Sequence, residues 1–305
     1  MSHVLHAIVE PGFFSSSPVR LAATLGGLVA IVAACVGVFT VIRGQAFAGE
    51  ALGDIGTTGG SSAYLIGIGA LWGFIGISIA AAAAMELIGI QRARGRDLAT
   101  GIVLGVGFGL AALFLYLGTT YDNLTGATIT ILFGSIFALN SSDLLPVLGF
   151  GLLVIVTLAT QYRPLLLASV SPELAAARGI PLRLLGAAYL FSLAIAVALS
   201  ALTIGAILST ALLVGPAAAA LRLTTRPGRA ILTAAALGVG LTWLGVLLAY
   251  DSYYWPPVHH GWPASFFIVT LVLLAYLIAS TTRPAGRGRP LPDATESGLS
   301  ATRYI

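Results

Sequence analysis

Residues 21–42 read LAATLGGLVAIVAACVGVFTVI, a stretch of 22 residues without a charged side chain. A helix of about 20 apolar residues is long enough to cross the hydrocarbon core of a membrane, which is about 30 Å thick. The whole chain has the same character, because 58% of its 305 residues are hydrophobic and only 9% are charged. Soluble domains carry about 25% charged residues. The composition therefore excludes a water-soluble globule and indicates a helical membrane protein that crosses the bilayer several times.

Working outward from this stretch, nine more apolar stretches follow, at 55–67, 70–90, 98–117, 124–139, 144–160, 182–202, 204–221, 230–250 and 264–280. Two of them, 55–67 and 124–139, are short and contain glycines or polar flanks. Such interrupted segments are tolerated at membrane depth only where protein or a water-filled cavity surrounds them. The sequence thus predicts an all-α bundle of about eight transmembrane helices with short re-entrant or half helices.

The chain divides into one large region and two short ends. We expect residues 1–20 to form an N-terminal segment without the features of a signal peptide, and 21–282 to form a single transmembrane domain. Residues 283–305 are rich in arginine, glycine and proline, and we expect a disordered cytoplasmic tail there. With 15 basic and 11 acidic residues, the chain has too little charge for a separate soluble catalytic or nucleic-acid domain.

The arginines set the predicted orientation, because cytoplasmic loops carry the excess of positive charge. All 15 basic residues are arginine. Their clusters can all be cytoplasmic if 55–90 is a hairpin and 124–139 is re-entrant; these clusters are Arg43, 92–96, 163–183, 222–229 and 283–289. Asp122 and the segment 251–260 then face the outside. The basic pI reflects these loops, so we expect no nucleic-acid partner.

The sequence gives little support for chemistry carried out by the chain itself. The one cysteine, Cys35, lies inside the first apolar stretch, which excludes an intrachain disulfide and a multi-cysteine metal cluster. Histidines occur only near the N-terminus and as a pair at 259–260, so no Ser, His and acid set is clustered. We therefore expect a protein that is not an enzyme and holds no permanent cofactor.

Residues 162–183, in a predicted cytoplasmic loop, contain the signals of a short helix. Ser171 can cap the free amides, Pro172 suits the first helical position, and Glu173 suits the positive end of the dipole. Gly179 can adopt the left-handed conformation that ends a helix. This helix is either a docking element for another protein or an interfacial helix resting on the membrane.

The same loop resembles the coupling segment of the permease subunits of metal-chelate ABC importers, the family that takes up zinc, manganese and iron. In that family a Y-R-P-L-L run leads to D-P-E-x-A-x-x-x-G-h-P-h-R, where h is apolar, and here Ser171 replaces the Asp. The likeness continues in order over about 40–280, at 38–43, 49–52, 64–67, 100–104, 132–136 and 205–217.

The resemblance implies several partners. Permeases of the family are dimers, their coupling segment inserts into a cytoplasmic ABC ATPase, and a separate extracellular or periplasmic binding protein delivers the metal. ATP belongs on the partner, because this chain has no lysine and so no Walker A motif. The family also implies the plasma or inner membrane, with lipid around the bundle. The residues expected to contact the ATPase are Ser171, Pro172, Glu173, Ala175, Arg178 and Gly179.

Glu50 and Asp54 are the candidate ligands of the metal pathway. Four residues apart, they share one face if the segment is helical, and two carboxylates near a membrane are costly unless they meet water, a cation or each other. A hydrated cytoplasmic turn is the alternative. The matching family segment is G-D-A-h-S-H-x-x-h-P-G, so Glu50 stands for its Asp and Asp54 for its His. An all-oxygen pair suits manganese or ferrous iron better than zinc.

On the opposite face, Asp122, Asp251, His259 and His260 are possible external metal contacts, because carboxylates and neutral imidazoles bind metals. Three hypotheses for the function follow. The first is the permease subunit of an ATP-driven importer of manganese, zinc or iron that works by alternating access. The second is a similar permease for a metal chelate, siderophore or cobalamin, for which Glu50 and Asp54 would be dispensable. The third is an ion-coupled secondary carrier that needs no ATPase.

Overall fold

The computed structural model describes residues 16–88, 96–121, 125–134, 136–254 and 261–282, and within these ranges the regular structure is helical. The helices are α2 (Ser17–Ile42), α3 (Ala46–Ile66), α4 (Ala70–Ile88), α5 (Arg96–Tyr121), α6 (Thr125–Phe133), α7 (Leu144–Val170), α8 (Pro172–Ala177), α9 (Leu182–Ile204), α10 (Ala206–Leu223), α11 (Pro227–Asp251) and α12 (Ala264–Thr281). Three 3-10 turns, η1 (Ile136–Ala138), η2 (Ser141–Asp143) and η3 (Ser252–Tyr254), complete them.

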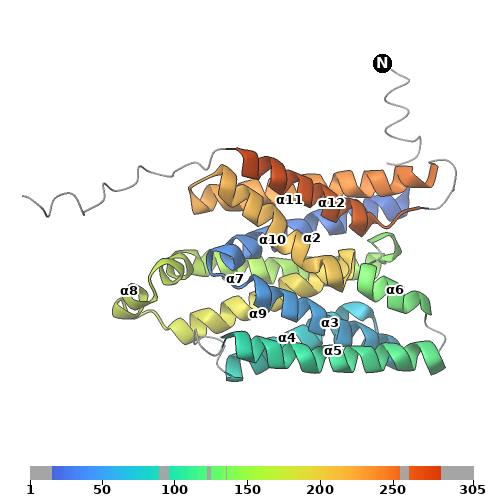
Figure 1. Ribbon diagram of the computed structural model, residues 1–305, viewed down its shortest axis with the longest axis horizontal. Coiled ribbons are helices and arrows are strands. Elements are labelled where there is room, and N and C mark those ends of the chain that lie inside the picture. Colours follow the sequence, from blue (N-terminus) through green and yellow to red (C-terminus); the bar gives the residue numbers. More distant parts are fainter. Residues whose placement is uncertain (1–15, 89–95, 122–124, 135, 255–260, 283–305) are drawn as a thin grey trace, which may run out of the picture.

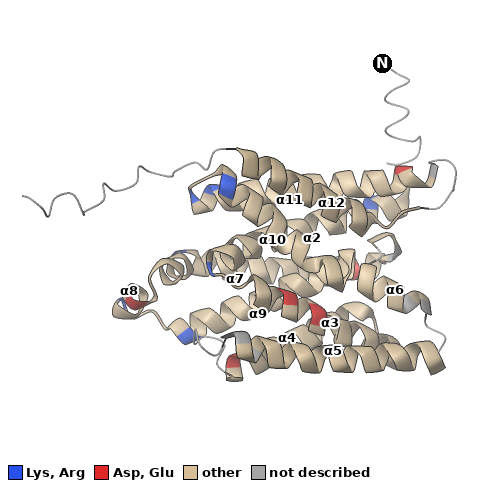
Figure 2. Cartoon of the chain, in the orientation of Figure 1, with Lys and Arg blue, Asp and Glu red and all other residues tan. Residues whose placement is uncertain are grey.

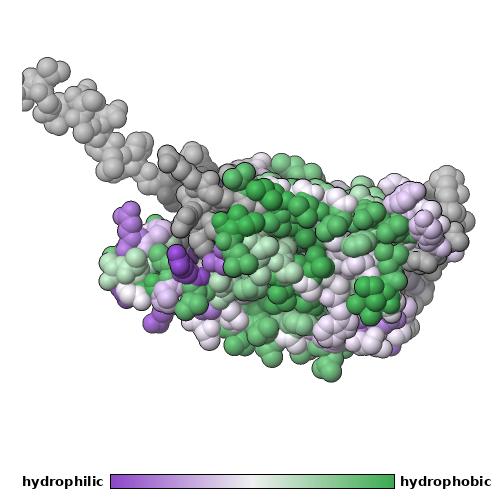
Figure 3. Space-filling view, turned by 90° about the horizontal axis from the view of Figure 1, so that it is seen from below, coloured by the Kyte–Doolittle hydropathy of each residue, from purple (hydrophilic) through white to green (hydrophobic). Residues whose placement is uncertain are grey.

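Among the described residues, eight helical segments are long and apolar enough to cross a membrane, and they include every long helix except α3. This confirms the predicted all-α bundle of about eight spans. The long helices lie side by side along one axis, and α8 projects from one end of the bundle (Figure 1). Hydrophobic side chains cover the middle of the molecule in the view of Figure 3, with hydrophilic residues gathered at the end that carries α8.

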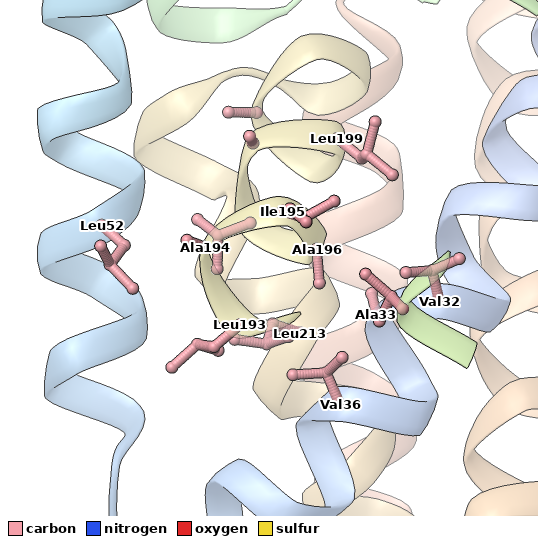
Figure 4. Close-up of a cluster of buried hydrophobic side chains, with 14 of the residues drawn as sticks. Val32, Ala33, Val36, Leu52, Leu193, Ala194, Ile195, Ala196, Leu199 and Leu213 are labelled. Atoms are coloured by element: carbon pink, nitrogen blue, oxygen red, sulfur yellow. The ribbon is translucent and has the colours of Figure 1, made fainter. Parts of the chain in front are cut away.

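Helix α9 forms the centre of the core. Its neighbours are α2, α3, α4, α7 and α10, and most of its residues are fully buried. Figure 4 shows Leu193, Ile195 and Leu199 of α9 among side chains from α2, α3 and α10. Small residues such as Ala194 and Ala196 alternate with these larger ones, and this allows neighbouring helices to approach closely. The central position of α9 fixes α3, which carries the candidate metal ligands, against the core.

Two glycines with positive φ form a close backbone contact between α6 and the turn that joins α9 to α10. Gly134 follows α6 with φ +76°, and Gly205 separates α9 from α10 with φ +89°. A Cβ on either residue would overlap the backbone of the other segment. Glycine is needed at both positions because side-chain-bearing residues rarely adopt these φ values. The contact holds the short helix α6 against the turn between α9 and α10, in agreement with the short half helix expected at 124–139.

The structure corrects three boundaries of the sequence analysis. Helix α2 begins at Ser17 rather than after residue 20, because Pro18 fits the first turn of a helix. Helix α3 begins at Ala46, nine residues before the apolar stretch 55–67, so its polar first half is helical as well. Helix α7 continues through Pro164 to Val170, so the first part of the predicted coupling loop 163–183 is helical. Neighbouring helices allow a membrane helix to contain a proline.

Candidate metal pathway and coupling segment

Glycines on the buried sides of α3 hold this helix close to its neighbours. A Cβ on Gly59 would overlap the carbonyl oxygen of Gly73 on α4, and a Cβ on Gly53 would lie 2.7 Å from Oγ of Ser209 on α10. Such contacts are possible only because glycine lets helix backbones approach closely. They also fix the rotation of α3 about its axis, and thereby decide which of its side chains face outward.

The outward side of α3 carries the two candidate ligands. Glu50 is exposed and Asp54 is half-buried, whereas the residues between them, 51–53, are buried. At 1.5 Å per residue, Glu50 lies about 6 Å and Asp54 about 12 Å along the helix from Ala46. Figure 2 shows acidic residues on α3 within the length of the bundle rather than at its end. The pair therefore lies on the flank of a helix rather than in a turn.

Chemically, the pair presents only carboxylate oxygens. Residues four apart on a helix have Cβ atoms about 5–6 Å apart, so two negative charges are close enough to repel each other. A divalent cation would relieve this repulsion and would find the oxygen ligands that manganese, magnesium and ferrous iron prefer. Two carboxylates cannot fill the six positions that such ions commonly use, so water or a second chain must supply the others.

Hydroxyl groups organise the helix immediately beyond Asp54. The hydroxyl of Thr57 donates to the backbone carbonyl of Asp54, one turn earlier. The hydroxyl of Thr58 donates to the backbone carbonyl of Gly107 on α5, with an oxygen–oxygen distance of 2.8 Å. Both threonines are buried. These hydrogen bonds satisfy the hydroxyls within the core and tie α3 to α5, so they support the ligand face without belonging to it.

Of the other metal contacts predicted from the sequence, only Asp251 lies in the described residues. Asp122, His259 and His260 lie outside the described residues. Asp251 is the last residue of α11, and with 6% of its surface exposed it is buried. Ser252, the next residue, accepts the backbone N–H of Trp262 at 2.9 Å, so this corner holds the start of α12 in place. Within the described part of the chain, no group of three or more His, Cys, Asp and Glu residues could hold a metal ion.

The coupling segment has the local structure that its sequence predicts. Oγ of Ser171 accepts the backbone N–H of Leu174 at 3.3 Å, Pro172 begins the helix, and Gly179 follows its end with φ +74°. Ala175 is the one residue of α8 that is fully buried, whereas residues 172–174 and 176–179 are exposed. Glu173 and Arg178 are therefore available to a partner, while Ala175 fixes the helix to the bundle.

Sequence analysis missed a buried polar contact near the same end of the bundle. The Arg43 guanidinium carbon lies 4.9 Å from the ring centre of Tyr189, and Nε of Arg43 donates to Oε1 of Gln45 at 3.4 Å. The hydroxyls of Tyr189 and Thr40 are 2.8 Å apart. This contact joins the end of α2 to α9. No local pattern could have revealed it, because Thr40 and Tyr189 are far apart in the sequence and each lies in an apolar stretch.

Figure 2 shows arginines mainly, though not only, at the end of the bundle that carries α8. Near α8 and at the turn between α10 and α11, the described arginines are Arg163, Arg178, Arg183, Arg222, Arg226 and Arg229. Under the positive-inside rule this is the cytoplasmic end. The membrane span that ends at Val170 has 30 residues, or about 45 Å of helix, against a hydrocarbon core of about 30 Å. The span is therefore longer than the core is thick, and its last part, which leads to α8, lies at the cytoplasmic end.

Comparison with known proteins agrees with this architecture. Residues 17–283 match the family described as the ABC 3 transport family. The manganese transport system membrane protein MntC of Halalkalibacterium halodurans is 31% identical over 226 residues, which cover 74% of this chain and 76% of MntC. The chelated iron transport system membrane protein YfeC of Yersinia pestis is 30% identical over 304 residues, 99% of this chain and 94% of YfeC.

A solved structure shows the same fold. The structure described as PsaBC from Streptococcus pneumoniae in complex with Fab contains a chain that superposes with a TM-score of 0.76 at 24% identity, covering 92% of this chain and 96% of that one. The eight apolar helical segments and the relatives together identify a multi-pass protein of the plasma membrane. Because the family match spans almost the whole helical bundle, the chain belongs to the ABC 3 transport family.

Proposed function

We propose that this chain is the membrane permease subunit of an ATP-driven importer of divalent metal ions, with manganese as the main substrate and iron or zinc as the alternatives. The observation that carries the proposal is the position of Glu50 and Asp54 on the outward flank of α3. A carboxylate within a membrane costs several kcal/mol unless it faces water, a cation or another protein surface. A pathway for a cation accounts for two of them on one face.

The ligand chemistry supports manganese. Both side chains offer hard oxygen ligands, which suit manganese and ferrous iron, whereas zinc prefers a set that includes imidazole or thiolate. The name of the relative MntC, a manganese transport system membrane protein, points the same way. During transport, the metal would be held briefly at this pair and released as the two sides of the membrane open in turn.

We propose further that two copies of the chain form the pathway. A single copy leaves Glu50 exposed on the side of the bundle, where lipid would otherwise contact it. A second copy related by a two-fold axis beside α3 would cover this face and place its own Glu50 and Asp54 opposite the first pair. Together the copies would offer four carboxylates, enough to compensate for much of the hydration that a dication loses. Lipid then contacts only the outer faces of the dimer.

Energy would come from a separate ABC ATPase that binds the coupling segment. The exposed face of α8, with Glu173, Leu174 and Arg178, supports this part of the proposal because it projects from the cytoplasmic end (Figure 1). The buried Ala175 would transmit movement of α8 to the bundle. A binding protein on the other side of the membrane would deliver the metal.

Metal accumulation in cells tests the proposal. The permease is expressed with the ATPase and binding protein of its own importer, in a host that lacks manganese uptake, and cell-associated manganese, iron and zinc are measured. We expect manganese to accumulate only when all three proteins are present, and the double variant Glu50→Gln/Asp54→Asn to abolish accumulation at unchanged membrane abundance. Equal accumulation by the double variant would refute the metal pathway.

The relative YfeC, which covers nearly the whole chain, supports a second candidate, a permease for a metal chelate. A chelate shields the charge of its metal, so Glu50 and Asp54 would be dispensable. A growth assay distinguishes the two candidates. With chelated iron as the sole iron source, cells that depend on the double variant for iron uptake should grow only if the chelate is the substrate.

A further inference from the structure

A second polar site lies at the end of the bundle away from α8. A cavity of about 230 Å³ is lined by the last turn of α3, the start of α4, helix α6, and Leu139, Asn140 and Asp143. Helix α7 begins directly beside it at Leu144 and ends beside α8 after 27 residues, a rise of about 40 Å. The cavity is therefore on the opposite side of the membrane from the coupling segment, where an imported ion would enter.

The polar side chains of the cavity carry oxygen atoms that can bind a cation. They are the phenol of Tyr64, the hydroxyl of Thr130, the amide of Asn140 and the carboxylate of Asp143. Oδ2 of Asp143 accepts the backbone N–H of Asn140 at 3.0 Å, and this bond fixes the orientation of the carboxylate. Of the described residues that line the cavity, none carries a positive charge. The site therefore offers oxygen ligands and a negative charge, and both favour binding of a cation.

The size of the cavity bears on which form of the cation it can hold. At about 230 Å³ it has room for an ion that keeps its water ligands. One carboxylate with neutral oxygens is also too weak a set to strip an ion such as magnesium or manganese of its water.

The helix ends around the cavity do not override the charge of Asp143. Helices α3, α6 and α9 end close to it, each two residues beyond a residue that lines the cavity, and present the negative ends of their dipoles. Helices α4 and α7 begin beside it and present positive ends. Each end is equivalent to about half an elementary charge, so the five contributions leave only a small negative excess, which adds to the charge of Asp143. The full charge of Asp143 decides the local potential.

We propose that this cavity captures the hydrated divalent cation before it reaches Glu50 and Asp54. The inference rests on the proposed metal import and adds an entry site to it. Tyr64 follows Asp54 by ten residues on α3, so the two sites are about 15 Å apart along one helix. The ion is held through its water ligands at Asp143 and loses them at the carboxylate pair.

The competing explanation is that Asp143 only forms the capping box of η2 with Asn140, and conservative variants separate the two roles. Asp143→Asn keeps an oxygen that can accept the N–H of Asn140 but removes the charge. Asp143→Glu keeps the charge but alters the cap. Ser142→Asn is the matched control, because Ser142 is exposed and does not line the cavity.

The first measurement is manganese uptake by the complete importer over a range of manganese concentrations. We expect Asp143→Asn to raise KM about tenfold with kcat within about twofold, and Asp143→Glu and Ser142→Asn to leave KM within about threefold of the wild type. The inference fails if Asp143→Asn leaves KM unchanged. It also fails if Asp143→Glu is impaired as strongly as Asp143→Asn, because that result indicates the capping role.

The second measurement is binding of Mn²⁺ to the purified full-length protein, followed by the loss of the electron paramagnetic resonance signal of free Mn²⁺. We expect a weaker and a tighter class of site. Asp143→Asn should remove the weaker class only, and Glu50→Gln/Asp54→Asn the tighter class only. If Asp143→Asn retains both classes, the entry site is refuted while the carboxylate pair stands. If the wild type binds no Mn²⁺, the proposed metal pathway itself is refuted.

Discussion

Breaking the coupling helix α8 should uncouple the permease from its ATPase without unfolding the bundle. The backbone N–H of Ala175 donates to the carbonyl of Ser171 at 3.1 Å, and this is the bond that closes the first turn of the helix. Ala175→Pro removes the N–H and brings the proline ring against the same carbonyl. The cost of a proline inside a helix is about 3 kcal/mol or more.

This cost can be converted into an expected loss of binding. If the ATPase binds only the folded helix, a cost of about 3 kcal/mol weakens association about 100-fold, since about 1.4 kcal/mol corresponds to a factor of ten. Variants of α8 with smaller expected costs should weaken association less. Ser171→Ala removes the cap and Ala175→Gly keeps the N–H, each at about 1 kcal/mol or about fivefold. Ser171→Asp keeps a cap and should change little.

The assay is association of the purified permease with its ATPase, measured together with manganese uptake. ATPase association and manganese uptake should fall together, least in Ser171→Asp and most in Ala175→Pro. The melting temperature of the permease in detergent should change by only a few degrees. The reasoning is refuted if Ala175→Pro binds the ATPase as tightly as Ser171→Asp does. In that case α8 is an interfacial helix and the ATPase binds elsewhere.

Three further predictions concern α3. Glu50→Gln or Asp54→Asn alone should lower manganese uptake about tenfold, because an interaction with a charged group is worth about 1.5–3 kcal/mol; uptake at matched membrane abundance checks this. Asp54→His should raise the ratio of zinc to manganese uptake in a competition assay, because imidazole suits zinc; an unchanged ratio shows that Asp54 is not a ligand. Gly59→Ala should lower the melting temperature in detergent by about 5 °C, since its Cβ overlaps the Gly73 carbonyl and overpacking costs about 1–3 kcal/mol. Gly76→Ala is the control and should not destabilise, because a Cβ there meets nothing within 4 Å.

The spans were predictable because hydrophobicity and length alone decide whether a segment crosses the bilayer. The local structure of the coupling helix was predictable for a similar reason. Ser171, Pro172 and Gly179 act on the backbone of their own turn, so their order along the chain carries the information.

The start of α3 could not be found in this way. Its first half carries Glu50, Asp54 and several glycines, which lower mean hydropathy and helix propensity together. The helix exists because those glycines pack against α4 and α10, and such contacts depend on the fold. For the same reason the sequence placed Glu50 and Asp54 on one face but could not say what that face meets. The cavity at Asp143 was missed because its oxygens come from segments as distant as Tyr64 and Thr130.

Transport by the reconstituted importer is the most direct test of ATP-driven metal uptake through this permease. The permease is reconstituted with its ATPase and binding protein in liposomes, and entry of Mn²⁺ is followed with ATP supplied on the side of α8. We expect uptake that requires ATP hydrolysis, is insensitive to a proton or sodium gradient, and is lost in Glu50→Gln/Asp54→Asn. Uptake by the permease alone, driven by an ion gradient in the absence of ATP, would contradict this expectation.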